Sequence, residues 1–377
     1  MDSDKIINMG KFNYNWKIKD TIFTKDKGKV FSCFSCGGGS TMGYKLAGFD
    51  VIGNLEIDKK KNADYLKNHN PKYNFNQDIR EFRMREDLPE ELYNLDILDG
   101  SPPCLLFSMA GSREEKWGEV FKHDGITQRW DDLYFEFIAL AKKLQPKVVI
   151  AENVKGLLIH DKGKTIQTIL KVLREDLDYY VPEPQIVNAM NFGVPQHRER
   201  VYIVGFRKDQ NVTEFTYPSP TDKTKTFADI KEEETVSAKY YLSTQYVKTL
   251  IAHKERHAAK GNGFGYEIIP DNGIANAIVV GGMGRERNLV IDTRLKDFTP
   301  VTNIKGEVNR DGLRRMTPRE WARLQGFPDS FIIGVADASA YKQFGNSVAV
   351  PAIQATAEEI IKRINLSKPV QYDTKRK

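Results

Sequence analysis

The sequence predicts an α/β fold, in which helices flank a mostly parallel β-sheet and a smaller module interrupts the chain. In the first half, short apolar runs alternate with amphipathic segments, as in repeated β–α units. From about residue 208 to 312 this alternation gives way to Thr-, Lys-, Asn- and Gly-rich sequence, which indicates a separate module. Regular signals return afterwards, so we expect the end of the chain to rejoin the first domain.

Composition limits the class of protein. The 377 residues are 40% hydrophobic, which is enough for a sizeable core. Three cysteines are too few for a disulfide scaffold or a four-thiolate zinc site, so we expect a reduced, cytoplasmic protein. We also expect a monomer without a metal ion. No run approaches the roughly 18 apolar residues of a membrane helix, which predicts no membrane association. The net charge of +6 suits a polyanionic partner.

Five apolar runs are the expected strands, and their alternation with helical segments implies mostly parallel pairing. They cover residues 29–35, 49–58, 92–100, 147–154 and 200–207.

Two helices are predicted by apolar residues that recur on one face. The first ends at Leu144 and has Asp131 or Asp132 as its N-cap. The second begins at Pro351, which suits the first turn of a helix. Their apolar faces comprise Leu133, Phe137, Leu140 and Leu144 in the first helix, and Ile353, Ala357, Ile360 and Ile364 in the second.

Residues 31–58 form a predicted strand, glycine turn, helix and strand, and Glu56 lies 20 residues beyond Cys36. This spacing is typical of a nucleoside cofactor site, where glycines let the backbone approach the ligand and the acid binds ribose hydroxyls. The pair Cys33 and Cys36 has the spacing of a redox dithiol, which remains an alternative. Two small buried thiols that do no chemistry are the third possibility.

Polar residues also follow the later strands. Cys104 comes after two prolines that stiffen the backbone, and Glu152 ends the next apolar run. Arg198 and Arg200 alternate as they enter the last of the five runs, so both side chains are expected on one face. A lone cysteine is more often a core residue than a nucleophile, but three such features at successive strand edges favour a reaction site.

The order of these motifs resembles that of the DNA cytosine carbon-5 methyltransferases of bacterial and phage restriction–modification systems. The resemblance covers most of the chain outside residues 208–312. It is carried by FSCGGG, Pro103-Cys104, Glu152-Asn153-Val154, QHRER, RLQGFPD (323–329) and FGNSVAVP (344–351).

The resemblance implies a Rossmann-like S-adenosylmethionine-dependent methyltransferase sheet with an inserted target-recognition domain. The catalytic domain is then expected to comprise residues 1–207 and 338–377, and the target-recognition domain residues 208–337. It also implies that S-adenosylmethionine is bound by Phe34, Gly37, Gly38, Gly39, Glu56, Ile57, Asp78, Pro103, Asn346 and Val348.

The implied reaction methylates cytosine in double-stranded DNA. Cys104 adds to carbon 6 of a flipped-out base, Glu152 contacts the ring nitrogen, and Arg198 and Arg200 supply positive charge. The polar segment 108–130 resembles a lid over that base.

Two residues depart from the family pattern. Cys36 stands where a glycine is common, which is expected to matter little if its backbone has a negative φ. Leu105 stands where a glutamine is frequent. The alternatives are a tRNA cytosine methyltransferase of the same fold, a DNA-binding protein without catalysis, and the dithiol oxidoreductase. Arg285, Arg287 and Asn288 are either base-reading residues or part of a solvated loop.

Overall fold

The computed structural model describes residues 14–103, 120–123, 126–129, 132–281, 284–301 and 306–364. The chain forms two compact units. The sheet unit comprises Lys19–Val187, Glu199–Ser219 and Ser347–Lys377. The insert unit comprises Met1–Ile18, Asn188–Arg198 and Pro220–Asn346.

The sheet unit is built on a mostly parallel β-sheet with the order β3-β2-β1-β4-β7-β11-β8, and β9 pairs with β11. The pairs from β3 to β7 are parallel, whereas β11 runs antiparallel to both β7 and β8. The prediction of an α/β fold is therefore confirmed. The strands are β1 (Lys29–Cys33), β2 (Asp50–Leu55), β3 (Tyr73–Phe75), β4 (Ile97–Gly100), β7 (Val148–Val154), β8 (Tyr179–Tyr180), β9 (Gln185–Asn188) and β11 (Glu199–Arg207).

Three predicted strands are shorter than expected, for local reasons. The first ends at Cys33, because Phe34 has a φ of 54° and leaves the extended conformation. The second ends at Leu55, and Asp58 beyond it is the N-cap of a helix. The third begins only at Ile97, because Glu90–Asn94 form a 3₁₀ helix.

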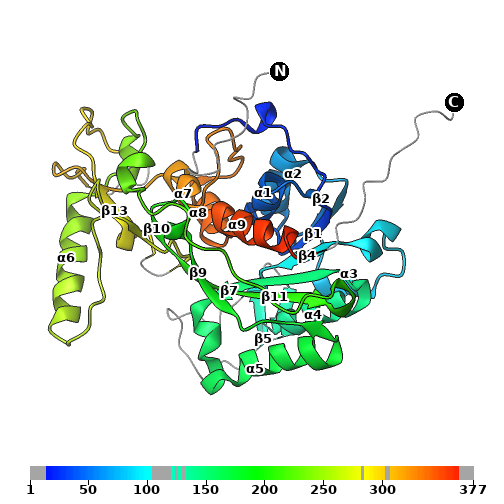
Figure 1. Ribbon diagram of the computed structural model, residues 1–377. Helices are drawn as coiled ribbons and strands as arrows, with labels where there is room; N and C mark the ends of the chain where they lie inside the picture. The colour runs from blue at the N-terminus through cyan, green and yellow to red at the C-terminus, as the bar shows by residue number, and fades with distance from the viewer. Residues whose placement is uncertain are drawn as a thin grey trace. The chain divides into compact units, whose positions relative to one another are not determined.

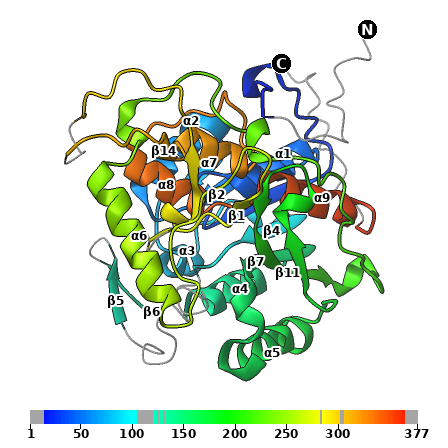
Figure 2. The same ribbon diagram turned by 90° about the vertical axis from the view of Figure 1, so that its left-hand side faces the viewer.

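Helices cover both faces of this sheet (Figures 1 and 2). In both views α1 and α9 lie on one side of the strands, and α4 and α5 lie on the other. The helices are α1 (Gly39–Leu46), α2 (Lys59–His69), α3 (Ile79–Met84), α4 (Asp132–Leu144), α5 (Lys164–Lys171) and α9 (Val350–Ile361).

Both helices predicted from periodicity are present. The predicted apolar face of α4 is buried, as is that of α9 together with Ile364 just beyond its end. Asp132 lies inside α4, and Asp131 lies outside the described residues. Pro351 occupies the first turn of α9, as expected from its fixed φ and missing N–H.

The insert unit has short strands and helices. Its strands are β10 (Gln196–His197) and β12 (Ala275–Asn276), which pair in parallel, and β13 (Leu289–Ile291) and β14 (Leu313–Arg315), which pair antiparallel. Its helices are α6 (Thr244–Ala258), α7 (Pro318–Leu324) and α8 (Asp337–Gly345).

A buried ion network organises the insert unit. The Arg314 guanidinium, fully buried, donates two hydrogen bonds of 2.8 Å to Glu320 and one of 3.0 Å to Asp292. Glu320 also forms a capping box with Thr317 at the start of α7. Buried charges are stable only when paired in this way, so the network fixes α7 against β14.

Residues 108–130, expected to form a lid, lie mostly outside the described residues. Within them the backbone of β5 (Val120–His123) and β6 (Ile126–Arg129) forms an antiparallel pair. In the described part of the chain, no helix is long and apolar enough to cross a membrane.

Candidate active site

The predicted cofactor turn joins β1 to α1, and its glycines are required by their surroundings. Gly38 has a φ of 83°, and a Cβ added there would overlap the His69 ring. A Cβ added at Gly39 would overlap the main-chain oxygen of Val348. The turn therefore packs against α2 and against the segment that precedes α9, and it has no room for larger residues.

Cys36 also has a positive φ, of 48°. The negative φ under which this residue was expected to matter little is therefore absent. A non-glycine residue in the left-handed region costs about 1–2 kcal/mol. The Cys36 N–H donates a 2.8 Å hydrogen bond to Glu56 Oε2, which helps to hold this conformation.

The two thiols of the turn are buried, with exposed fractions of 1% for Cys33 and 6% for Cys36. Burial raises the pKa of Cys33 well above its usual range and that of Cys36 to about 12. Both thiols are therefore protonated at neutral pH, and the thiolate that dithiol chemistry needs is suppressed. This geometry favours the interpretation that they do no chemistry.

Glu56 links the turn to the end of β2. Its Oε1 accepts a 2.8 Å hydrogen bond from Asp58 N–H, while Oε2 binds the turn. Burial raises the pKa of Glu56, and nearby Lys61 opposes this rise. The next residue, Ile57, is 36% exposed and offers an apolar surface beside the acid.

The other predicted cofactor residues lie as follows. Asp78 caps α3 by accepting a 2.8 Å hydrogen bond from Arg80 N–H. Val348 is buried in the sheet unit, whereas Asn346 is exposed and ends α8 in the insert unit. Pro103 is half-buried at the last described position before Cys104.

Glu152 and Arg200 meet across β7 and β11. The Arg200 Nε lies 3.3 Å from Glu152 Oε1, and the Glu152 side chain is nearly buried. Among the described residues, Glu152 Oε1 has no hydrogen-bond partner. Asn153 Nδ2 donates a 3.3 Å hydrogen bond to the Pro102 carbonyl, so the end of β7 is tied to the loop that follows β4.

Cys104 and Leu105 lie outside the described residues, so the nucleophile itself is not placed. The residues before it, up to Pro103, are placed. They follow β4, which runs parallel to β7 with Gly100 opposite Ala151. The segment that leads to Cys104 and the segment that carries Glu152 therefore leave the same edge of the sheet.

Arg198 lies in the insert unit and is buried. Its guanidinium donates hydrogen bonds to the carbonyls of Ile278, at 2.9 Å, and Gly345, at 3.1 Å. These bonds join the loop after β12 to the end of α8. Arg198 is thus in direct contact with the residue before Asn346.

The residues considered as base readers have partners within the insert unit. Arg287 pairs with Glu267 at 3.1 Å, and the buried Asn288 bonds both main-chain groups of Asn276. The Arg285 guanidinium lies over the Tyr341 ring. This arrangement favours a structural role for all three.

Comparison with known proteins identifies the family of the chain. The family model of the C-5 cytosine-specific DNA methylases matches residues 28–362. The chain belongs to this family. It is 65% identical over 277 residues to the type II methyltransferase M.HpaII of Haemophilus parainfluenzae, covering 74% of each chain. It is also 36% identical to the type II methyltransferase M.SsoII of Shigella sonnei, over 89% of this chain and 81% of that one.

Solved structures with lower identity to the methylase show the same fold. S. pombe Dnmt2 methyltransferase matches with a TM-score of 0.60 and 18% identity, over 89% of this chain and 97% of that one. A putative DNA modification methyltransferase from an E. coli prophage matches with a TM-score of 0.59 and 21% identity, over 89% and 99%. At these identities the likeness supports the fold alone.

Three polar groups that support the cofactor turn of the methylase were not among the predicted site residues. The neutral His69 ring has Nε2 3.2 Å from the Gly37 carbonyl, and burial, then Lys45, lowers its pKa to about 3. Asn54, Asn62 and Asn74 bond one another, and Asn54 Nδ2 also donates to Ser35 Oγ at 3.0 Å. No local motif marks these residues, because they come from separate elements.

Asp99 is the third group, a carboxylate that is only 1% exposed in the middle of the sheet. It accepts hydrogen bonds from Ser32 Oγ at 2.8 Å and Tyr44 Oη at 3.1 Å, and Ser40 adds another. Burial raises its pKa to about 7 against the effect of these hydroxyls. An acid inside an apolar strand, as in LDILDG, was the available signal, because such a group needs partners.

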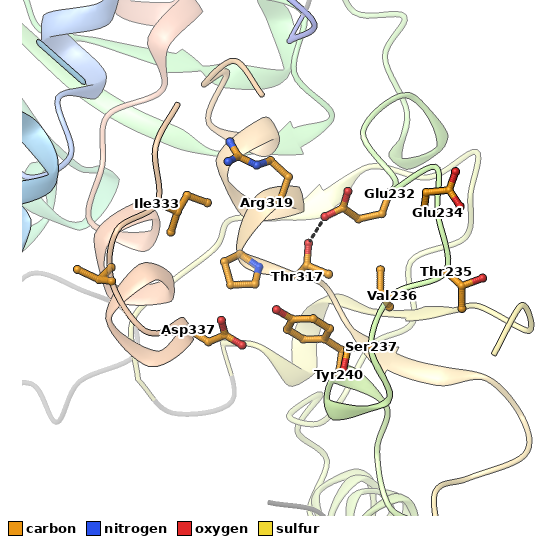
Figure 3. Close-up of a pocket in the computed structure, with 12 residues that line it drawn as sticks. Glu232, Glu234, Thr235, Val236, Ser237, Tyr240, Thr317, Arg319, Ile333 and Asp337 are labelled. Atoms are coloured by element: carbon orange, nitrogen blue, oxygen red, sulfur yellow. Dashed lines mark hydrogen bonds between the residues drawn. The ribbon is translucent and has the colours of Figure 1, made fainter. Parts of the chain in front are cut away.

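A separate cavity of about 450 Å³ lies within the insert unit (Figure 3). Its wall includes Glu232, Glu234 and Asp337, and Glu232 accepts a 3.0 Å hydrogen bond from Thr317 Oγ1. None of the predicted site residues lines it. Among the described residues of the methylase, no group of three or more His, Cys, Asp or Glu side chains is placed to hold a metal ion.

Proposed function

We propose that this methylase modifies one cytosine within a short, specific sequence of double-stranded DNA, as the modification enzyme of a type II restriction–modification system. The curated relatives M.HpaII and M.SsoII, both described as type II methyltransferases, support this assignment. The observation that carries the chemistry is the nearly buried Glu152, held by Arg200 beside the segment that leads to Cys104. We further propose that it acts in the cytoplasm as a monomer.

S-adenosylmethionine is the proposed methyl donor, and the residues of the turn fit it. Gly37, Gly38 and Gly39 have no side chains, so the turn offers main-chain groups that a ligand can approach closely. Each carboxylate oxygen of Glu56 has a second lone pair for a ribose hydroxyl. Ile57 offers an apolar face for adenine.

The remaining cofactor contacts are proposed from the family pattern. Phe34 and Gly37 belong to the turn, and Asp78 lies just before α3 as its N-cap. The proposed cofactor contacts also include Pro103, Asn346 and Val348.

The proposed reaction begins at carbon 6 of a cytosine that has left the base stack. The Cys104 thiolate forms a covalent bond to carbon 6, while Glu152 supplies a hydrogen bond and proton at the ring nitrogen. Carbon 5 then becomes nucleophilic and takes the methyl group that S-adenosylmethionine supplies. Loss of the carbon-5 proton and elimination of the thiol release the product and restore Cys104.

The arginines have different proposed tasks. Arg200 orients the Glu152 carboxyl through their 3.3 Å contact. Arg198 holds the end of α8, and hence Asn346, through its bond to the Gly345 carbonyl. We assign sequence reading to the insert unit, within the predicted range 208–337.

The proposal is tested with duplex DNA that carries 5-fluorocytosine at the target, where fluorine cannot leave as a proton. The wild-type protein should form a covalent adduct that depends on the methyl donor, and Cys104→Ala should form none. Glu152→Gln should slow methylation by roughly 10²-fold, which is the range for loss of acid–base assistance. An undiminished adduct with Cys104→Ala would refute the assignment of the nucleophile.

The nucleic acid substrate is tested separately by expressing the protein in a methylation-free bacterium. Bisulfite sequencing should show methylcytosine at one short plasmid motif, because each mismatched base pair costs about 1–3 kcal/mol. Even methylation of all cytosines would exclude sequence reading. Methylated tRNA together with unmodified plasmid DNA would show that the substrate is RNA and not DNA.

A further inference from the structure

Helix α6 is a largely exposed element of the insert unit. Of its 15 residues, Thr244–Ala258, only Leu250 is buried. Leu250 packs with Leu289 of β13 and Leu313 of β14, and Figure 1 shows α6 running beside β13. One side of the helix therefore holds it to the unit, and the opposite side faces outward.

The outward side carries cations. Lys248, Ala252 and Arg256 follow one another at four-residue spacing, so they form a single stripe along the helix. Leu250 is two residues from Lys248, which places it roughly 200° around the helix. Lys260, which follows the helix, is exposed as well.

These three cations lack the ion-pair partners that several arginines of the same unit have. Arg287, Arg294, Arg314, Arg315 and Arg323 of the insert unit are all ion-paired. Among the residues that the structure describes, the side chains of Lys248, Arg256 and Lys260 have no hydrogen-bond or ion-pair partner. A cation without an internal partner is available to an external anion.

From this we infer that the outward face of α6, defined by Lys248, Arg256 and Lys260, contacts the phosphate backbone of the DNA substrate. Lys248 and Arg256 lie about 12 Å apart along the helix axis. One strand of B-DNA carries a phosphate about every 3.4 Å of its axis, so the two side chains match phosphates three or four nucleotides apart. Ala252 between them leaves the surface low enough for a backbone to approach.

Glu255 provides an internal check, because it is the only acid on α6 and is exposed beside this stripe. An anion there repels a phosphate. Its removal should strengthen DNA binding if the face is used, and should have no effect otherwise.

The test measures duplex binding by fluorescence anisotropy over a series of salt concentrations. In wild type, log K for duplex binding should fall linearly with log salt. In the double variant Lys248→Ala, Arg256→Ala this negative slope should become shallower by about 1.8, at about 0.9 for each phosphate that is no longer neutralised. The weakening should be equal for cognate and unrelated duplexes, because phosphate contacts carry no sequence information. Glu255→Gln should bind more tightly than wild type at fixed salt.

Lys164→Glu is the matched control, since it lowers the net charge by the same amount at an exposed position on α5. It should leave the slope unchanged. An unchanged slope in the double variant, an equal change in the control, or weakening confined to the cognate sequence would each overturn the inference. The inference rests on the duplex substrate proposed above; failure of the wild type to bind duplex DNA would instead reject that substrate.

Discussion

Asp99 gives a pH dependence of stability that can be worked out from its surroundings. Its pKa is raised from 3.8 to about 7, first by burial and then by the charge of Glu152, while the hydroxyls of Ser32, Ser40 and Tyr44 oppose the rise. Cys33 and Tyr65 are the other titratable groups whose charge interacts with it. Between pH 3.8 and about 7, the native state therefore keeps a proton on Asp99 that the unfolded state releases.

This retained proton stabilises the native state most at low pH. Because the native state binds more protons in this range, the free energy of unfolding falls as pH rises towards 7 and then levels off. Each pH unit is worth about 1.4 kcal/mol, so the loss between about pH 5.5 and 7 is about 2 kcal/mol. In Asp99→Asn the new side chain has the same shape but does not titrate, so this variant should not show the loss of stability.

The assay is urea unfolding of wild type and Asp99→Asn at about pH 5.5 and about pH 8.5, followed by circular dichroism. The free energy of unfolding of the variant minus that of wild type should increase by about 2 kcal/mol from the lower pH to the higher pH. The two proteins are compared at the same pH because the titrations of their other groups cancel in the difference. A difference that is the same at both pH values would refute the assigned protonation of Asp99.

Asp292 supplies a control of opposite character. Burial alone would raise its pKa, but hydrogen bonds from Arg294 and the charge of Arg314 hold it below its usual range. Its stabilising effect is therefore complete above the ordinary value of 3.8 and is lost only at lower pH. Asp292→Asn should lose the same stability, about 3–5 kcal/mol for a broken buried pair, at both pH values.

Three further predictions concern the cofactor turn. Gly38→Ala should abolish S-adenosylmethionine binding in calorimetry while circular dichroism stays near wild type, because the added Cβ meets His69; normal affinity would show that the turn tolerates a side chain. Glu56→Ala should weaken cofactor binding by roughly 10-fold or more through loss of charged hydrogen bonds, with DNA affinity as the unaffected control. The double variant Cys33→Ala, Cys36→Ala should retain most methylation activity, and inactivation by mild oxidant that disappears in this variant would revive the dithiol interpretation.

Much of the sheet unit could be predicted from sequence because its signals are local. Apolar runs located the strands, and four-residue periodicity located α4 and α9. The distance in sequence between Cys36 and Glu56 correctly placed the acid against the turn, since a β–α–β unit of that length returns to its starting edge.

What escaped prediction depends on contacts between distant residues. The positive φ of Cys36 is set by its hydrogen bond to Glu56 and by the packing of the turn, not by any preference of cysteine. The insert unit has strands of two or three residues, too short to show alternation. The buried Arg314 ion pairs with Asp292 and Glu320 come from separate elements, and no spacing in the sequence reveals them.

The packing of α9 on α1 has a consequence for the order of events during synthesis. Gly39 lies against the Val348 carbonyl, and Gly43 in the same helix leaves space for the Ile353 side chain. The wall of the cofactor turn is thus completed by residues made about 300 positions later, and contacts of such long range are slow to form. A ribosome-bound chain that stops before Val348 should not bind the methyl donor. Methyl transfer is therefore expected only after the segment from Val348 to Ile353 has been made and has packed on α1.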